Sequence, residues 1–219
     1  LEEYRSKFPE QAKSFNSLMA SELPDGWDSE IPIFSPDDKA EATRVSSGKI
    51  LNAIAKKVPN LVGGSADLAP STKTIISGDA AQSADNALGR NIHFGVREFA
   101  MGAIVNGMAL HGGIIPYAAT FLIFSDYMRP ALRLASLMNV HSIFVFTHDS
   151  IAVGEDGPTH QPIEQLASLR AIPNLVVLRP ADANETAEAW KIAVSKKGPV
   201  VMALTRQNLP VIDRNKFAP

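Results

Sequence analysis

Short apolar runs alternate with longer helical patterns from about residue 42 onward, and this alternation restricts the fold more than any other feature of the sequence. Such runs, bounded by turn residues, are typical of strands that are buried on both faces of a sheet. We expect strands at 61–62, 114–117, 142–147, 175–178 and 200–204, and helices at 42–57, 97–110, 126–138, 162–170 and 183–194. The order predicts a three-layer α/β fold, in which a doubly wound, mainly parallel sheet carries helices on both faces.

The first 40 residues differ in character from the rest. A charged, helix-like stretch at 2–15 precedes a segment rich in proline and aspartate at 23–38, which is typical of a linker. We therefore predict an inter-domain linker or extension at 1–40 and a compact domain at 41–219. Because the sequence starts at Leu1 without a methionine, a basic segment or a cleavage motif, we expect it to be part of a longer protein.

The composition argues against several kinds of partner. The chain has 219 residues, a formal net charge of -2 and no cysteine. Such a balance gives no general attraction to nucleic acid or to anionic membranes, so we expect neither as a partner. The lack of cysteine excludes disulfides and thiolate metal sites and suits a reducing compartment, so we expect the cytoplasm. The uncharged stretch at 99–125 contains Gly112, Gly113 and Pro116, so we interpret it as a buried helix, a turn and a strand rather than a membrane span.

Polar and aromatic residues follow the expected strands at the point where each strand ends. Ligands of open α/β sheets bind at the carboxyl ends of the strands, so these residues predict a pocket at one sheet edge. The densest group is segment 147–162, which places two histidines and three acids among glycines that let the backbone turn closely around a ligand. A polar surface loop is the alternative interpretation. The fold alone would not name a reaction.

Two local patterns add to this picture. Asp182 followed by Glu185 predicts a capped start for the helix at 183–194. Small and polar residues between Ser71 and Arg90 suggest a mobile loop.

Segment 147–164 resembles the substrate loop of transketolase, a family that depends on thiamine diphosphate. Segments 63–71, 95–99 and 206–209 agree with the family in the same order, and the resemblance covers most of the chain from Arg44 to about Leu209. It implies the thiamine-diphosphate-binding fold. Residues 41–219 would then be the pyrimidine-binding domain, with the diphosphate-binding and C-terminal domains absent from this chain.

The resemblance also implies a reaction of the pentose phosphate pathway. The family reversibly transfers a two-carbon ketol group from a ketose phosphate to an aldose phosphate through the thiamine diphosphate ylide. The Gly-Asp-Gly and Asn-Asn segments that hold Mg²⁺ (or Ca²⁺) and the diphosphate in this family do not occur here, so we expect that domain to carry the metal and this chain to carry no metal ligand. The active site would need a homodimer, with the diphosphate-binding domain of a partner subunit facing this domain. The fragment alone is expected to be inactive.

Glu98 begins the apolar helix pattern at 97–110. A glutamate at this place also suits the helix dipole, without any further role. The resemblance places it against the aminopyrimidine ring of the cofactor, where a hydrogen bond to a ring nitrogen would promote the imino tautomer.

Phe121, Phe124 and Tyr127 recur at a spacing of three. Such a stripe is by default core packing. The resemblance favours a slot that stacks the aminopyrimidine, because an aromatic slot suits a flat heteroaromatic ring. Asp67 and Leu68 match family positions that contact the cofactor.

The resemblance assigns Arg44, Ser71, His148 and Arg206 to the phosphate of a sugar phosphate. Arginine pairs bidentately with phosphate oxygens, and an imidazole and a hydroxyl add donors. Each arginine alone could equally be an exposed ion-pair residue.

Asp156 and His160 are implied to act at the sugar itself. Asp156 would accept a hydrogen bond from a sugar hydroxyl and so select one stereochemistry. His160 would stabilise or transfer protons at the substrate oxygen, which makes Glu98, His148 and His160 the expected catalytic residues.

Two kinds of alternative stay open. Dihydroxyacetone synthase and 1-deoxyxylulose-5-phosphate synthase are related thiamine enzymes that share segment 154–160, although the triplets at 97–99 and 206–208 favour transketolase. A non-catalytic assembly or regulatory domain that kept the fold is the other alternative.

Overall fold

The computed structural model describes residues 2–216 and contains a six-stranded sheet in the order β2-β1-β3-β4-β6-β5. Every pair of neighbouring strands is parallel, which confirms the predicted doubly wound fold. The strands are β1 (Leu61–Ser65), β2 (Asn91–His93), β3 (Ile115–Phe121), β4 (Ile143–Thr147), β5 (Val176–Leu178) and β6 (Val200–Ala203).

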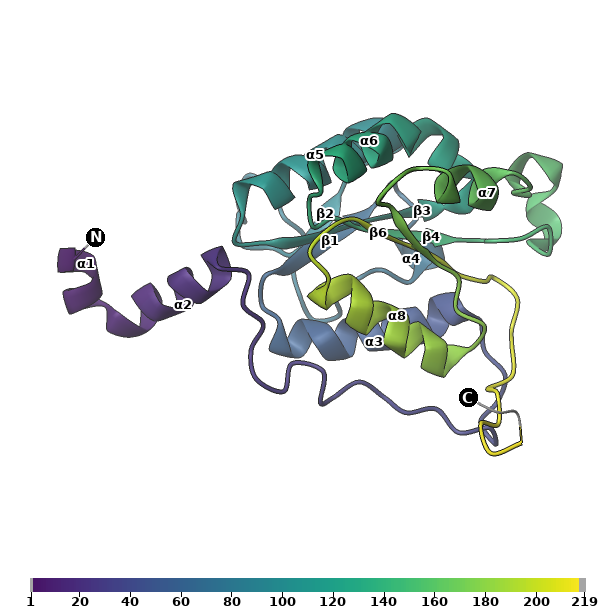
Figure 1. Cartoon of the computed structure of the whole chain (residues 1–219), viewed down its shortest axis with the longest axis horizontal. Coiled ribbons are helices and arrows are strands. Elements are labelled where there is room, and N and C mark those ends of the chain that lie inside the picture. The colour runs from purple at the N-terminus through teal and green to yellow at the C-terminus, as the bar shows by residue number, and fades with distance from the viewer. Residues whose placement is uncertain (1, 217–219) are drawn as a thin grey trace.

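Helices cover both faces of this sheet (Figure 1). One face carries α5 (Glu98–His111), α6 (Ser125–Met138) and α7 (Gln165–Arg170), and the other carries α3 (Thr43–Lys57) and α8 (Ala183–Ser195). The shorter elements are α4 (Ala69–Thr72) and the 3₁₀ turns η1 (Leu122–Phe124), η2 (Gly154–Asp156) and η3 (Pro158–His160). In the extension, α1 (Glu2–Lys7) and α2 (Pro9–Met19) project away from the sheet.

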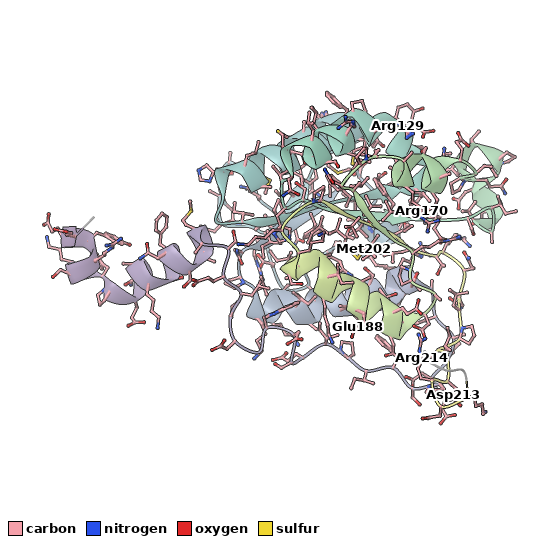
Figure 2. All side chains as sticks on the ribbon, viewed as in Figure 1. Arg129, Arg170, Glu188, Met202, Asp213 and Arg214 are labelled. Carbon is pink, nitrogen blue, oxygen red and sulfur yellow. The ribbon has the colours of Figure 1, made fainter. Side chains whose placement is uncertain are left out.

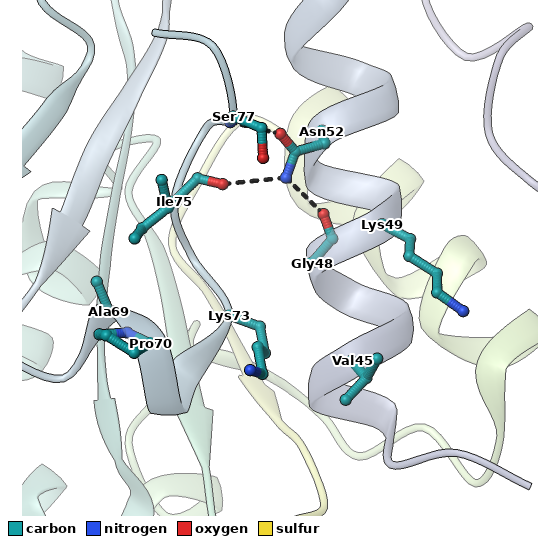
Figure 3. A pocket seen from close by; sticks show the side chains of 9 residues that line it. All are labelled: Val45, Gly48, Lys49, Asn52, Ala69, Pro70, Lys73, Ile75 and Ser77. Atoms are coloured by element: carbon teal, nitrogen blue, oxygen red, sulfur yellow. Dashed lines mark hydrogen bonds between the residues drawn. The ribbon is translucent and has the colours of Figure 1, made fainter. Parts of the chain in front are cut away.

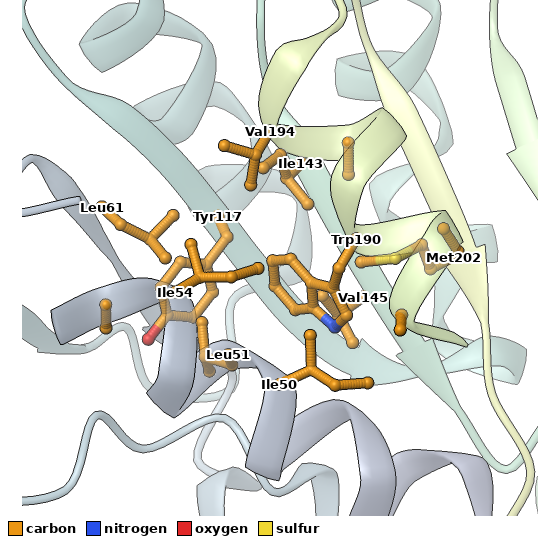
Figure 4. Close-up of a cluster of buried hydrophobic side chains, with 14 of the residues drawn as sticks. Ile50, Leu51, Ile54, Leu61, Tyr117, Ile143, Val145, Trp190, Val194 and Met202 are labelled. Atoms are coloured by element: carbon orange, nitrogen blue, oxygen red, sulfur yellow. The ribbon is translucent and has the colours of Figure 1, made fainter. Parts of the chain in front are cut away.

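Each face of the sheet has its own apolar core. Between the sheet and the pair α3 and α8, Trp190 and Tyr117 are fully buried (Figure 4). Their polar atoms are satisfied, because the Trp190 Nε1–H donates to Ser47 Oγ at 2.8 Å and the Tyr117 hydroxyl donates to the Thr74 carbonyl at 2.9 Å. Burial of each large side chain stabilises the fold by about 1.5–3 kcal/mol, so these two helices are fixed firmly on the sheet.

The start of α8 shows the predicted capping pattern. Asp182 Oδ1 accepts from the Glu185 N–H at 2.8 Å, and Glu185 Oε2 reaches back to the Ala181 N–H at 2.7 Å. Arg214 adds an ion pair to Glu185 at 3.1 Å, so the end of the described chain is held against this helix. Figure 2 shows Arg214 and Asp213 at that end, below the sheet that carries Met202.

Several local expectations were wrong. Strand β2 and helix α4 were not predicted, because each is too short to show a periodic pattern. The helix expected from Pro162 begins at Gln165, whose side-chain Oε1 accepts from the Ile163 N–H at 2.8 Å and so holds a turn before the helix.

Segment 71–90 is tied to the sheet, unlike the mobile loop expected there. The Asn91 side chain binds both the N–H and the carbonyl of Ile76, at 2.8 and 2.9 Å. An ion pair joins Arg90 Nε to Asp79 Oδ2. Asn52 of α3 donates to the Ile75 carbonyl at 3.0 Å.

The middle of β1 needs two glycines. A Cβ at Gly63 would lie 2.1 Å from the Tyr117 carbonyl oxygen, and one at Gly64 would lie 1.8 Å from the Ile92 carbonyl oxygen. Only glycine lets the neighbouring strands approach so closely, so the edge that follows β1 has a fixed position. Segment 99–125 forms most of α5, a turn, β3 and η1, and no helix between residues 2 and 216 has the length and apolar character needed to cross a membrane.

Candidate functional site

The predicted site residues gather at the carboxyl edge of the sheet. Asp67 and Leu68 follow β1, Glu98 follows β2, and Phe124 follows β3. His148 follows β4 directly. Because all these strands are parallel, their carboxyl ends meet at one edge, and side chains far apart in the sequence become neighbours.

A cavity of about 580 Å³ opens at this edge beside β1 and β3. We call it the aromatic cavity, and its lining residues are Ala66, Asp67, Leu68, Val96, Glu98, Phe121, Phe124, Tyr127 and His160. Every residue predicted to contact the cofactor therefore lines the same space. Ala66 and Val96 were not singled out as contact residues, although they stand within segments 63–71 and 95–99.

Glu98 is the first residue of α5 and is only 8% exposed. Its place in the first helical turn suits the dipole, as the simpler interpretation expected, yet its side chain also lines the cavity. The preceding Arg97 has a non-helical backbone, with φ -149° and ψ 63°, and its Nη1 donates to the Phe94 carbonyl at 3.1 Å. This contact fixes the turn that brings Glu98 to the cavity wall.

The three aromatic rings form one wall of the cavity, and their exposure to solvent increases along it. Phe121 and Phe124 are stacked, with ring centroids 5.9 Å apart and an interplanar angle of 12°. Tyr127 follows at 6.2 Å from Phe124 and is 66% exposed. The wall thus runs from the buried sheet edge to the open surface, which leaves flat apolar faces along one side of the cavity.

The four residues assigned to phosphate, Arg44, Ser71, His148 and Arg206, form a second group together with Asp156, which was assigned to a sugar hydroxyl. We call this group of five the arginine cluster. Arg44 Nη1 donates to the Ser71 carbonyl at 2.8 Å. Asp156 Oδ2 lies 3.6 Å from Arg206 Nε and 3.9 Å from His148 Nε2. The structure thus brings these residues together, with Asp156 between Arg206 and His148, and their roles stay predictions.

Positive charge exceeds negative charge in this cluster. The pKa of Arg44 is lowered by burial and by the charge of Arg206, and Asp156 offsets only part of this effect. Within the described chain, Arg44 Nε and Asp156 Oδ2 are buried without a hydrogen-bond partner. Two guanidinium groups facing one carboxylate favour the approach of an anion with several oxygens.

His148 connects the cluster to the cavity. It is 3% exposed, and its ring stacks on Phe121 with centroids 3.7 Å apart. Its backbone has a φ of 58°, a left-handed conformation that is uncommon outside glycine and often marks a functional site. Burial, followed by the charge of Arg44, lowers the pKa of His148 to about 4, so the ring is neutral at pH 7.

His160 lies between the same two groups. Its ring meets Phe124 edge-on at 5.3 Å, and its Nδ1 lies 2.9 Å from Thr159 Oγ1. Since Phe121 contacts both histidines, the aromatic cavity and the arginine cluster form one continuous site.

A second cavity, of about 470 Å³, lies between α3 and the segment that follows α4 (Figure 3). Asn52 points from α3 toward Ile75 and Ser77, and its amide binds both of them. This cavity contains none of the predicted site residues, so it plays no part in the candidate site. Between residues 2 and 216 there is also no group of three or more histidine, aspartate or glutamate side chains placed to hold a metal ion.

Comparison with known proteins decides the family. Residues 39–211 match the family model described as the transketolase pyrimidine binding domain. The chain belongs to this transketolase domain family. It is 59% identical over 212 residues to the transketolase of Halalkalibacterium halodurans, covering 96% of this chain and 32% of that protein.

Solved transketolase structures agree in fold. The Pichia stipitis enzyme, in a complex with sedoheptulose-7-phosphate, is 46% identical with a TM-score of 0.93, covering 96% of this chain and 32% of that one. A split-gene transketolase, described as an inactive β4 tetramer, is 30% identical with a TM-score of 0.64, covering 80% of this chain and 55% of that one. The chain thus spans about a third of the length of the curated transketolases it matches.

Membership of the transketolase family implies thiamine diphosphate as the cofactor. The aromatic cavity fits its aminopyrimidine ring, because it offers flat aromatic faces on one side and the buried carboxylate of Glu98 on another.

Proposed function

We propose that this chain supplies the pyrimidine-binding half of a transketolase active site, which reversibly transfers a two-carbon ketol group from a ketose phosphate to an aldose phosphate. One observation carries the proposal: a cavity with a buried acid and an aromatic wall is continuous with a cluster of two arginines. The first part suits a flat heteroaromatic ring and the second suits a phosphate.

On the cofactor side, Glu98, Phe121, Phe124, Tyr127, Asp67 and Leu68 would hold the aminopyrimidine ring. When bound, thiamine diphosphate supplies the carbon nucleophile that attacks a sugar carbonyl. Glu98 would hold a proton against a ring nitrogen, and the low exposure of its carboxylate would strengthen that hydrogen bond. Phe121 and Phe124 would keep water from the ring faces.

On the substrate side, Arg44, Ser71, His148 and Arg206 would bind the phosphate. The buried, unpartnered Arg44 Nε would then find an acceptor. Asp156 would accept a hydrogen bond from a sugar hydroxyl, and His160 would exchange a proton at the substrate oxygen near the aromatic wall. His148 is neutral at pH 7, so it can donate a hydrogen bond without adding charge.

A partner is expected over α5 and α6. Large apolar side chains are half-exposed or more on these helices, with 52% for Phe99, 59% for Leu110 and 67% for Leu137. Exposed apolar residues gathered in this way mark protein contacts. We propose that the diphosphate-binding domain of a partner subunit covers this surface in a homodimer and brings the Mg²⁺ or Ca²⁺ site. A cytoplasmic location is proposed with it, on the lack of cysteine.

The test is a chimera in which this chain replaces the matching 212 residues of the Halalkalibacterium enzyme. We expect turnover of xylulose 5-phosphate as donor and none of pyruvate. Turnover of pyruvate would instead indicate 1-deoxyxylulose-5-phosphate synthase. A folded, dimeric chimera without either activity would favour a non-catalytic domain.

A further inference from the structure

Arg44 and Arg206 lie close together although they come from opposite ends of the domain. Their like charges oppose this arrangement: the pKa of Arg44 is lowered first by burial and then by the charge of Arg206. The single carboxylate of Asp156 lies 3.6 Å from Arg206 and neutralises only one of them. Some other contact must therefore hold the two arginines in place.

The residues that precede the two arginines are joined by reciprocal hydrogen bonds. The Thr43 N–H donates to Thr205 Oγ1 at 2.9 Å, and the Thr205 N–H donates to Thr43 Oγ1 at 2.7 Å. Both threonines are buried, with exposed fractions of 0% and 4%. An antiparallel bridge between Glu41 and Leu209 continues the same contact outward.

The direction of the third bond in this pair can be assigned. The two hydroxyl oxygens lie 3.2 Å apart, so either could donate. The Thr205 hydroxyl already donates its one hydrogen to the Gln207 carbonyl at 2.9 Å. The Thr43 hydroxyl must therefore donate to Thr205 Oγ1, and every polar group of the pair is satisfied.

Thr205 also caps α3 from a distance. The residue at the N-cap position is Ala42, which has no side-chain acceptor. The first free N–H groups of the helix bind Thr205 instead: that of Thr43 to its hydroxyl, and that of Arg44 to its carbonyl at 3.4 Å. An N-cap oxygen stabilises the first turn of a helix. Here it is supplied from the end of β6.

We propose that Thr43 and Thr205 are positioning residues that set the spacing of the two guanidinium groups and thereby the preference for phosphorylated substrates. We call this pair the threonine clamp. It fixes the first turn of α3, which carries Arg44, against the segment after β6 that carries Arg206. This inference rests on the proposed function, because it takes the arginine cluster as the phosphate site.

The experiment measures the affinity of the 219-residue chain for inorganic phosphate by calorimetry, together with the NMR signals of the arginine Nε–H groups. Thr205→Val keeps the shape but removes the cap oxygen, and we expect it to weaken phosphate binding by about tenfold, which corresponds to about 1.4 kcal/mol. Thr205→Ser keeps the hydroxyl, so we expect it to stay within about twofold of the unmodified chain.

Ser142→Ala is the matched control. Ser142 is also fully buried, and its hydroxyl donates to Asn106 at 3.0 Å, but it lies at the amino end of β4, away from the arginines. We expect Ser142→Ala to lower the unfolding temperature without changing the phosphate affinity. If Thr205 had a purely structural role, Thr205→Val would show this same pattern.

The outcomes separate the clamp from the proposed function. If Arg206→Gln weakens phosphate binding and Thr205→Val does not, the clamp is wrong and the phosphate site stands. If the unmodified chain binds no phosphate, or Arg206→Gln binds it as well, the phosphate site and the clamp are both wrong. Should Thr205→Val not fold, Thr43→Ala leaves the cap of α3 in place, and unchanged affinity in that variant would overturn the clamp.

Discussion

The aromatic cavity and the arginine cluster share one edge of the sheet but are built in opposite ways. The cavity is an open space of about 580 Å³ with one buried acid, Glu98, and a wall of rings. The cluster is made of charged and polar side chains, in which Asp156 Oδ2 lies 3.6 Å from Arg206 Nε and 3.9 Å from His148 Nε2. The cavity thus depends on shape, whereas the cluster depends on charge spacing.

Because of this difference, we expect the two regions to respond differently to substitutions. A shape-based site fails when a wall or its one acid is removed, while a charge-based site fails gradually as the spacing of its charges changes. His148 belongs to both, because its ring stacks on Phe121 and its Nε2 faces Asp156. The following changes test each part in turn.

The largest effect is expected from Glu98→Ala in a complete transketolase that carries this chain. Loss of the buried carboxylate on the cavity wall should lower turnover by about a thousandfold, as for other general acid–base groups. The unfolding temperature should change little, because no described hydrogen bond depends on this carboxylate. Turnover at the starting level would contradict the role proposed for Glu98.

A smaller, selective effect is expected from Arg206→Gln. Losing a charge-assisted hydrogen bond costs about 1.5–3 kcal/mol, so kcat/KM for phosphorylated donors should fall by about tenfold to a hundredfold. Unphosphorylated donors should be affected far less. Arg170→Gln, on the exposed end of α7, is the control and should leave both unchanged. Equal losses for the two donor types would remove the phosphate assignment.

The third effect is on the stability of the domain rather than on turnover, and it arises from His148, the residue that the two regions share. The pKa of His148 falls from 6.5 to about 4 on folding, so between these values the unfolded chain binds more protons. The free energy of unfolding is therefore highest above pH 6.5 and declines as the pH falls toward 4, by about 3 kcal/mol. The charges of Arg44, Arg206 and His160 add to this effect, and Asp156 opposes it.

Urea unfolding at a series of pH values checks this expectation. His148→Gln should flatten the decline between pH 6.5 and 4. Some slope should remain, because burial also lowers the pKa of His141. Identical slopes for the unmodified chain and the variant would show that His148 does not carry the effect.

Most of the fold could be predicted from the sequence, because buried parallel strands and the helices between them leave strong periodic patterns. The cofactor residues could be located because they stand in contiguous motifs at strand ends. Their roles came from the resemblance and stay predictions. Periodicity did not reveal β2 and α4, because a three-residue strand and a four-residue helix do not repeat their pattern even twice.

The threonine clamp shows a different limit. Thr43 and Thr205 are 162 residues apart, and neither stands in a recognisable motif. Their pairing follows from the strand order, in which β6 lies beside β4 and ends next to the start of α3. A local sequence pattern holds no information about such a contact. The sequence placed Arg44 and Arg206 in one site only through the resemblance to transketolase, which assigns both to the same phosphate.

The same long separation has a consequence for the order of folding. Contacts between distant residues form late, because a large loop must close before they contribute any stability. The first turn of α3 lacks an internal cap, so it stays frayed until the end of β6 docks. We therefore expect the two arginines to reach their final spacing only in the last stage of folding. The chain should bind an anion only once the whole domain has folded.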